Sequence, residues 1–156
     1  MQICSAGLCK LRKKRLKAMP LLPETQSVSG WPKLLLRLEG AALLATASFI
    51  YGRIDGGWGL FALLFFAPDL SFLAYLAGPR IGTIGYNCAH TTLAPLLLGA
   101  LGVWFGETML THFALIYLAH IGFDRALGYG LKYGTGFGDT HLGRIAPAAK
   151  NASFAQ

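Results

Sequence analysis

Four ionisable side chains interrupt the apolar part of this chain, and their types suit metal binding or proton transfer. Asp69, His90, His120 and Asp124 each lie in or beside a long hydrophobic stretch. Charged groups in hydrocarbon cost free energy, so such residues normally face the interior of a helical bundle and mark function. Imidazole nitrogens and carboxylate oxygens are also the ligands of zinc and similar divalent ions. The residue types therefore indicate a metal site, a proton relay or a satisfied structural network.

Helical spacing brings some of these groups together but identifies no known motif. His120 and Asp124 are four residues apart, so they share one helix face, and His90 shares a face with Tyr86 and Asn87. The chain contains no His-Glu-x-x-His and no Cys-x-x-Cys pair. The spacing is compatible with a site but does not name its chemistry.

The composition shows what kind of scaffold must position these groups. The chain has 156 residues, of which 54% are hydrophobic and 13% charged, and its mean hydropathy is +0.48. Soluble domains carry roughly 25% charged residues, which they need for a polar surface. The sequence therefore predicts an integral membrane protein, whose first partner is the lipid bilayer.

Four stretches have the length and apolar character of a membrane span, for which about 20 residues are needed. They cover residues 34–52, 57–77, 81–105 and 108–130. The connections between them are short, so neighbouring spans must run antiparallel. The predicted fold is an all-α membrane protein with a four-helix antiparallel transmembrane bundle.

The bundle is expected at residues 33–131, between a basic, poorly ordered tail at 1–32 and a Gly-rich segment at 132–156. Six of the fourteen lysines and arginines lie between residues 10 and 17, so the net charge of +7 is mostly local to the tail. Cytoplasmic segments of membrane proteins carry such an excess of bases. We therefore expect a multi-pass protein of the cell membrane with both termini in the cytoplasm. Nucleic-acid binding is not expected, because no binding fold accompanies the tail.

The ionisable groups fall at similar depths in the four predicted spans. Counted from the predicted cytoplasmic ends, Glu39, Asp69, His90, His120 and Asp124 lie between about 8 and 15 Å deep at 1.5 Å per residue. All four spans thus contribute to one polar layer in the cytoplasmic half. His112 lies further round its helix and nearer the outer side, so we place it outside this cluster.

The Gly-rich C-terminal segment either is a flexible tail or folds back under the bundle. Five glycines between residues 128 and 138 exclude a regular helix. Tyr129, Tyr133 and Phe137 are not typical linker residues. In the folded-back alternative, Asp139 and His141 reach the polar layer and close the site.

Small residues and prolines predict the packing and shape of the spans. Gly99, Gly102 and Gly106 lie close to one face, as small residues do where helices approach closely. Such faces pack within the bundle or, in the alternative, join copies in a homo-oligomer. Pro68 and Pro95 each remove a helical hydrogen bond, so we expect the second and third spans to kink.

The sequence also carries a set of local motifs that resembles a known family. These motifs are Ala67-Pro68-Asp69-Leu70-Ser71, Gly78-Pro79-Arg80, Tyr86-Asn87-Cys88-Ala89-His90, His120 to Tyr133, and Asp139 to Ile145. They look like a family of small, mostly bacterial integral membrane proteins that is catalogued as a domain of unknown function. The resemblance covers about Leu34 to Ile145 and implies no activity.

Three functions remain open at this stage. A structural or partner-binding membrane protein, with its polar cluster internally satisfied, is the interpretation that we favour. The alternative is a membrane-embedded, metal-dependent, hydrolase-like enzyme with a divalent metal such as zinc at Asp69, His90, His120 and Asp124. Pro68-Asp69 and His90 are similar to motifs of small membrane-bound metal-dependent hydrolases, although the His-Arg-Gly-x-Thr-His-Ser run of those enzymes is absent. A transport pathway is disfavoured, because few ionisable groups lie in the outer halves of the spans.

Overall fold

A computed structural model describes residues 27–134 and 138–144 of the chain. Most of the predicted basic tail, and the end of the Gly-rich segment from residue 145, lie outside the described residues. The described part is mostly helical. Its elements are α2 (Gly30–Arg53), α3 (Trp58–Leu64), the 3₁₀ helix η1 (Ala67–Ala77), α4 (Pro79–Ala89), α5 (Leu93–Phe105), α6 (Thr108–Leu127), β1 (Asp139–Thr140) and β2 (Gly143–Arg144).

Two helical stretches are long and apolar enough to cross a membrane, and a third qualifies if one bent pair counts as a span. The first two are Gly30–Arg53 and Trp58–Ala77, and the pair is α4 with α5, which are bent by 40° at their junction. Large apolar side chains on these stretches face outward, with Leu76 87% and Trp104 83% exposed. Such a surface fits hydrocarbon better than water, in agreement with the predicted membrane class.

Helix α6 lies at the centre of the molecule and is not among these apolar candidates. It carries two histidines, an aspartate and an arginine, yet it supplies half of the buried helical residues in the described part, more than any other helix. A helix enclosed by protein rather than by lipid can carry polar side chains that find partners there. This position explains how the fourth predicted span tolerates its polar content.

Helices α2 and α6 touch through glycines. A Cβ on Gly122 would lie 2.6 Å from the Leu44 amide nitrogen, and one on Gly40 would lie 2.7 Å from the Ala126 amide nitrogen. Similarly, a Cβ on Gly102 would come within 2.6 Å of the Thr111 hydroxyl. These contacts use small residues for packing within one chain, which is one of the two uses that the sequence left open.

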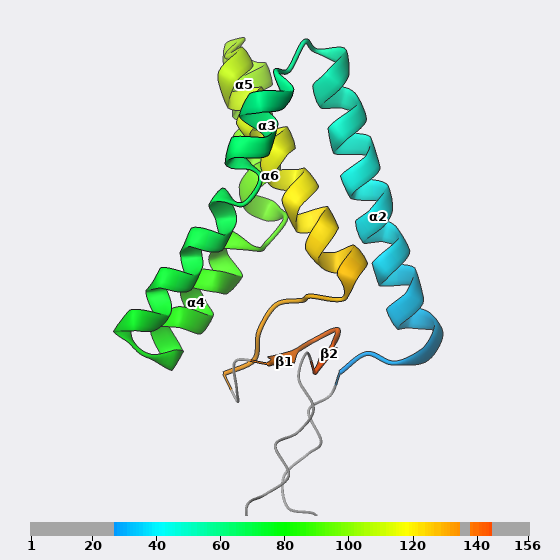
Figure 1. The fold of residues 1–156 in the computed structure, drawn as a ribbon, viewed down its shortest axis with the longest axis vertical. Coiled ribbons are helices and arrows are strands. Elements are labelled where there is room, and N and C mark those ends of the chain that lie inside the picture. The colour runs from blue at the N-terminus through cyan, green and yellow to red at the C-terminus, as the bar shows by residue number, and fades with distance from the viewer. Residues whose placement is uncertain (1–26, 135–137, 145–156) are drawn as a thin grey trace, which may run out of the picture.

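The hairpin of η1 and α4 forms a separate arm. Its two helices pack on each other, with Gly82 against the ring of Tyr75 and Gly85 against Ala74. Figure 1 shows this arm diverging from α2, while α5 and α3 rise to the opposite end beside α6. Successive segments still run in alternating directions, but the helices do not form one parallel-sided bundle.

The second and third predicted spans are broken more completely than a proline kink would require. The α-helix of the second span ends at Leu64, and a 3₁₀ helix begins at Ala67, with Pro68 in its first turn. The third span ends as a helix at Ala89 and restarts at Leu93, with Pro95 in the first turn of α5. Proline is tolerated in a first turn because no helical hydrogen bond is lost there. The expected kink in the third span is thus a break between α4 and α5, which together still pass as one bent candidate span.

We expect Gly122→Ala to destabilise the protein by about 1–3 kcal/mol, because the new methyl group meets the α2 backbone. The measurement is the unfolding midpoint of detergent-purified protein, followed by circular dichroism. Gly59→Ala is the matched control, since nothing lies within 4 Å of a Cβ there and alanine favours a helix. Equal stability of Gly122→Ala and wild type would contradict the close α2–α6 contact.

Candidate metal centre

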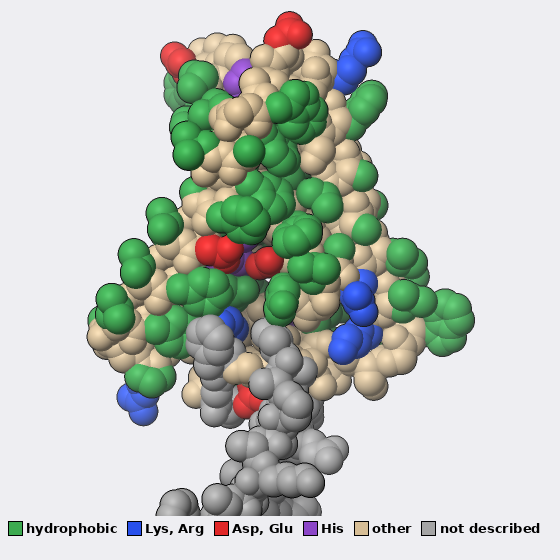
Figure 2. Space-filling view, viewed as in Figure 1, with side chains coloured by type: hydrophobic (Ala, Val, Ile, Leu, Met, Phe, Trp, Pro, Cys, Tyr) green, Lys and Arg blue, Asp and Glu red, His purple; other side chains and the backbone are tan. Residues whose placement is uncertain are grey.

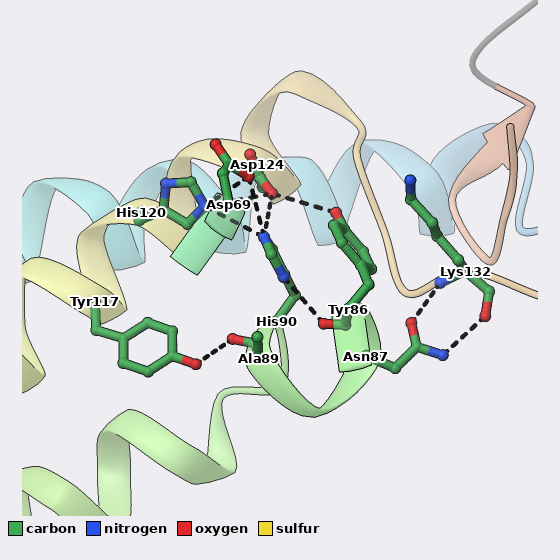
Figure 3. A network of polar contacts seen from close by, with 9 residues as sticks. All are labelled: Asp69, Tyr86, Asn87, Ala89, His90, Tyr117, His120, Asp124 and Lys132. Carbon is green, nitrogen blue, oxygen red and sulfur yellow. Dashed lines mark hydrogen bonds and ion pairs between the residues drawn. The ribbon is translucent and has the colours of Figure 1, made fainter. Parts of the chain in front are cut away.

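The breaks in the helices place three segments around one point. Asp69 lies in the first turn of η1, and His90 lies immediately after α4, with φ −105° and ψ 13°. His120 and Asp124 lie one turn apart on α6. Ending α4 at Ala89 leaves His90 as its C-terminal cap, and Figure 3 shows its imidazole directed toward the α6 pair.

The donor atoms of these four residues lie at nearly equal distances from one another. The Nε2 atoms of His90 and His120 are 3.3 Å apart. Nε2 of His90 is 3.4 Å from Asp69 Oδ1 and 3.5 Å from Asp124 Oδ2, and the corresponding distances from His120 are 3.6 and 3.8 Å. All four donors lie within 4.8 Å of one another.

These distances match the edges of a coordination tetrahedron. Zinc bonds to imidazole nitrogen and carboxylate oxygen are about 2.0–2.2 Å long, so the ligand atoms of a tetrahedral site are about 3.3–3.6 Å apart. Five of the six donor pairs lie between 3.3 and 3.8 Å. The four side chains thus surround a space of the right size for one divalent ion.

The cluster is buried on one side and open on the other. His120 is 1% exposed and His90 4%, whereas the side chain of Asp69 is 35% exposed. Figure 2 shows acidic groups and a histidine at the surface midway along the molecule, surrounded by hydrophobic side chains. Two carboxylates with two neutral imidazoles carry a charge of −2, which a divalent cation would cancel in this apolar setting.

Further contacts orient the imidazoles and carboxylates. Nδ1 of His90 lies 3.0 Å from the Tyr86 carbonyl oxygen, so an N–H there leaves the lone pair of Nε2 for the cluster. The Tyr86 hydroxyl donates to Asp124 Oδ2 over 3.5 Å. Metal-bound histidines commonly donate a hydrogen bond from their second nitrogen, and the Nδ1 contact of His90 fits this pattern. Nδ1 of His120 is buried and has no hydrogen-bond partner among the described residues.

Lys132 is a buried cation next to the cluster that the sequence did not single out as a site residue. Its Nζ lies over the rings of Phe72, Tyr75 and Tyr86, at 4.4–5.3 Å from their centroids. Burial lowers the pKa of this ammonium to about 8, although Asp124 and Asp69 act in the opposite direction. The sequence around Lys132 does not predict its burial, because the aromatic rings that cover it come from η1 and α4.

The C-terminal segment folds back under the helices, but it does not close the cluster. Asn87 fastens it at Lys132, donating from Nδ2 to the carbonyl over 2.9 Å and accepting from the amide at Oδ1 over 2.7 Å. His141 accepts from the Leu131 amide at Nδ1, and burial lowers the pKa of its imidazole. Asp139 is buried in β1 and is not one of the clustered donors. The structure thus places Asp139 and His141 in the C-terminal hairpin rather than among the four clustered donors.

Glu39 also lies apart from the other four predicted groups. It is exposed and lines a separate cavity of 190 Å³ with Arg125 and His141. Its neighbour Gly40 is the residue that α2 presents to α6, and adjacent helical residues point about 100° apart. Depth counting carries no information on the rotation of a helix, which is what separates Glu39 from the four donors. His112 bonds the Ile54 carbonyl and lies outside the cluster, as expected.

Comparison with known proteins gives a family but no activity. The family model described as Domain of unknown function (DUF4260) matches residues 33–145, which is more than half of the chain. No curated protein and no solved structure matches it.

We expect Asn87→Ala to release the C-terminal segment locally, because both hydrogen bonds to the Lys132 backbone are lost. Opening should become easier by about 1–3 kcal/mol. Hydrogen–deuterium exchange of a peptide containing Lys132 measures this. Asn87→Asp keeps the acceptor for the Lys132 amide and should retain most of its protection. Unchanged exchange in Asn87→Ala would show that the amide bridge does not hold the segment.

Proposed function

The chain belongs to the DUF4260 family, and we propose that it is an integral membrane protein with a metal-dependent hydrolytic centre. One divalent ion, zinc in the first instance, would be held by Asp69, His90, His120 and Asp124. The observation that carries this proposal is the near-tetrahedral set of distances among four buried or half-buried donors. A purely internal hydrogen-bond network does not require four donor atoms to face one common point.

The opening at Asp69 supports a catalytic rather than a sealed site. A bound divalent ion lowers the pKa of a coordinated water, which provides a nucleophile at neutral pH. In hydrolysis the water oxygen joins the electrophilic carbon or phosphorus, and the bond to the leaving oxygen breaks. The released proton passes to that leaving oxygen. Asp69 is the donor most accessible from outside, so a carboxylate oxygen there can accept the proton in transit.

A structural metal site is the second candidate, and the number of donors favours it. Structural zinc sites usually have four protein ligands, whereas catalytic sites keep one position open. Here the ion would join η1 and α4 to α6, between which the described helices make few other contacts. In that case the metal would hold the arm on the rest of the molecule, which agrees with a structural or partner-binding role.

For the membrane arrangement, we propose four crossings with both termini in the cytoplasm. The α4–α5 pair would count as one crossing and α6 as the central one. The alternating directions in Figure 1 support this order. Positive charge on the tail and at Arg80 supports the orientation. Because glycines of α2, α5 and α6 are used inside the chain, a homo-oligomer would need other surfaces.

We expect purified protein to hold about one zinc, manganese or iron per chain. His90→Ala and His120→Ala should each lower metal affinity at least tenfold, since one donor is removed. Elemental analysis of detergent-purified protein after gentle preparation measures the content. His112→Ala is the control, because it also truncates a buried histidine but leaves the cluster intact. A metal-free wild type, even after reconstitution with each ion, would overturn the proposal.

Chelation separates the two candidates. Removal of a catalytic metal should leave the unfolding midpoint almost unchanged. Removal of a structural metal should lower it strongly, because metal binding there is coupled to folding.

The proposed orientation predicts opposite labelling of two positions at the ends of α4–α5. In a background with Cys4, Cys9 and Cys88 replaced by serine, Glu107→Cys should react with a membrane-impermeant maleimide in intact cells. Arg80→Cys should react only after permeabilisation. Both native side chains are exposed, so burial does not confuse the comparison. The reverse pattern would invert the topology.

A further inference from the structure

An apolar cavity of 390 Å³ lies next to the cluster of Asp69, His90, His120 and Asp124. It is lined by Leu64, Ala67, Pro68, Ser71, Ala89, Leu98, Phe113, Ile116 and Tyr117. This volume falls in the range of about 300–1,000 Å³ that is usual for small-molecule sites. Its lining is mostly hydrocarbon, as expected for a site that takes an apolar chain.

The cavity and the cluster share the same three structural segments. Pro68 precedes Asp69, Ala89 precedes His90, and Tyr117 lies one turn before His120 on α6. The Tyr117 hydroxyl donates to the Ala89 carbonyl, which joins α6 to the end of α4 beside the histidines. Figure 3 shows Tyr117 and Ala89 alongside His120 and His90. The four donors therefore lie on residues close in sequence to the cavity lining.

Ser71 is the second observation that points to a ligand. It lines the cavity, and its hydroxyl is buried with no hydrogen-bond partner among the described residues. A buried hydroxyl without a partner destabilises the protein, because nothing compensates for its lost contact with water. A plain hydrocarbon would not relieve this cost, but a ligand with an acceptor oxygen near the start of its chain would.

A second apolar cavity differs from the Ser71 cavity in its polar groups. It has a volume of 550 Å³ between α2, α5 and α6, with Pro95, Gly99 and Leu115 in its lining. The hydroxyl in its lining is that of Thr111, which already donates to the Glu107 carbonyl. This cavity has the properties of an ordinary lipid contact, whereas the Ser71 cavity combines apolar walls, an unsatisfied hydroxyl and the cluster.

We propose that the Ser71 cavity binds the acyl chain of an ester lipid, whose ester carbonyl oxygen accepts a hydrogen bond from the Ser71 hydroxyl and whose polar head faces the four donors. This inference rests on the proposed function and names the substrate class as membrane ester lipids. In this proposal the acyl chain of the lipid enters the cavity from the bilayer, so the lipid need not leave the membrane.

The test is retention of lipid by the detergent-purified full chain, measured by native mass spectrometry after incubation with a diacyl phospholipid. Ala67→Phe fills the cavity and should abolish retention of the bound lipid. Ala62→Phe is the matched control, because Ala62 is exposed on the preceding helix of the same span and does not line the cavity. Equal retention by Ala67→Phe and wild type would overturn the proposal.

The Ser71 contact is tested with a dialkyl ether lipid of the same chain length. Wild type should retain the ester lipid about fivefold better, and Ser71→Ala should lose this preference. No preference in wild type would refute the ester contact. Metal content is measured in the same samples, and Ala67→Phe should keep its metal. If the wild type holds metal but retains no lipid, only this inference is contradicted. If it retains lipid but holds no metal, only the proposed function is contradicted.

Discussion

Charge inside an apolar molecule must be balanced, and this constraint organises the structure. Asp69 and Asp124 lie together with His90 and His120 in a chain whose outer surface is hydrocarbon. Two carboxylates in such surroundings need protons, cations or donors close by. The donor positions described above provide one shared point for a cation, and Tyr86 and Lys132 add a hydroxyl and an ammonium nearby. The arm of η1 and α4 meets α6 where these groups converge.

Irregular backbone is what makes the convergence possible. In continuous helices through 57–77 and 81–105, Asp69 and His90 would lie in mid-helix, flanked on both sides by turns of their own helix. Instead, η1 begins just before Asp69, and α4 ends just before His90. Non-helical backbone at membrane depth is tolerated where protein covers it. Pro68 and Pro95 favour these breaks, and the close packing of η1 on α4 supports them.

The proposed metal centre and the acyl-chain cavity place polar chemistry beside a hydrocarbon compartment. The cluster opens at Asp69, and the cavity begins one residue away at Pro68 and Ala89. An enzyme on membrane lipids needs this juxtaposition, because its substrate has a long apolar part and one reactive polar link. The same arrangement separates the molecule into a polar junction, where we propose the metal centre, and an α2–α6 core that is packed through glycines.

The sequence by itself determined the membrane class, the helical character and the four residue types of the cluster. These follow from local properties, namely hydropathy over about 20 residues and the rarity of charge within it. The family assignment likewise agreed with the motifs between residues 33 and 145.

Only the tertiary structure decided which of these residues face one another. Glu39 points away because Gly40 is needed at the α2–α6 contact, and Asp139 and His141 pack in the hairpin below the cluster. Lys132 acquires its aromatic surroundings from helices 45 or more residues earlier in the chain. Helix rotation, helix breaks and the fold-back of the C-terminal segment depend on contacts between distant residues. A local pattern does not contain that information, since the same sequence spacing permits several rotations until packing selects one.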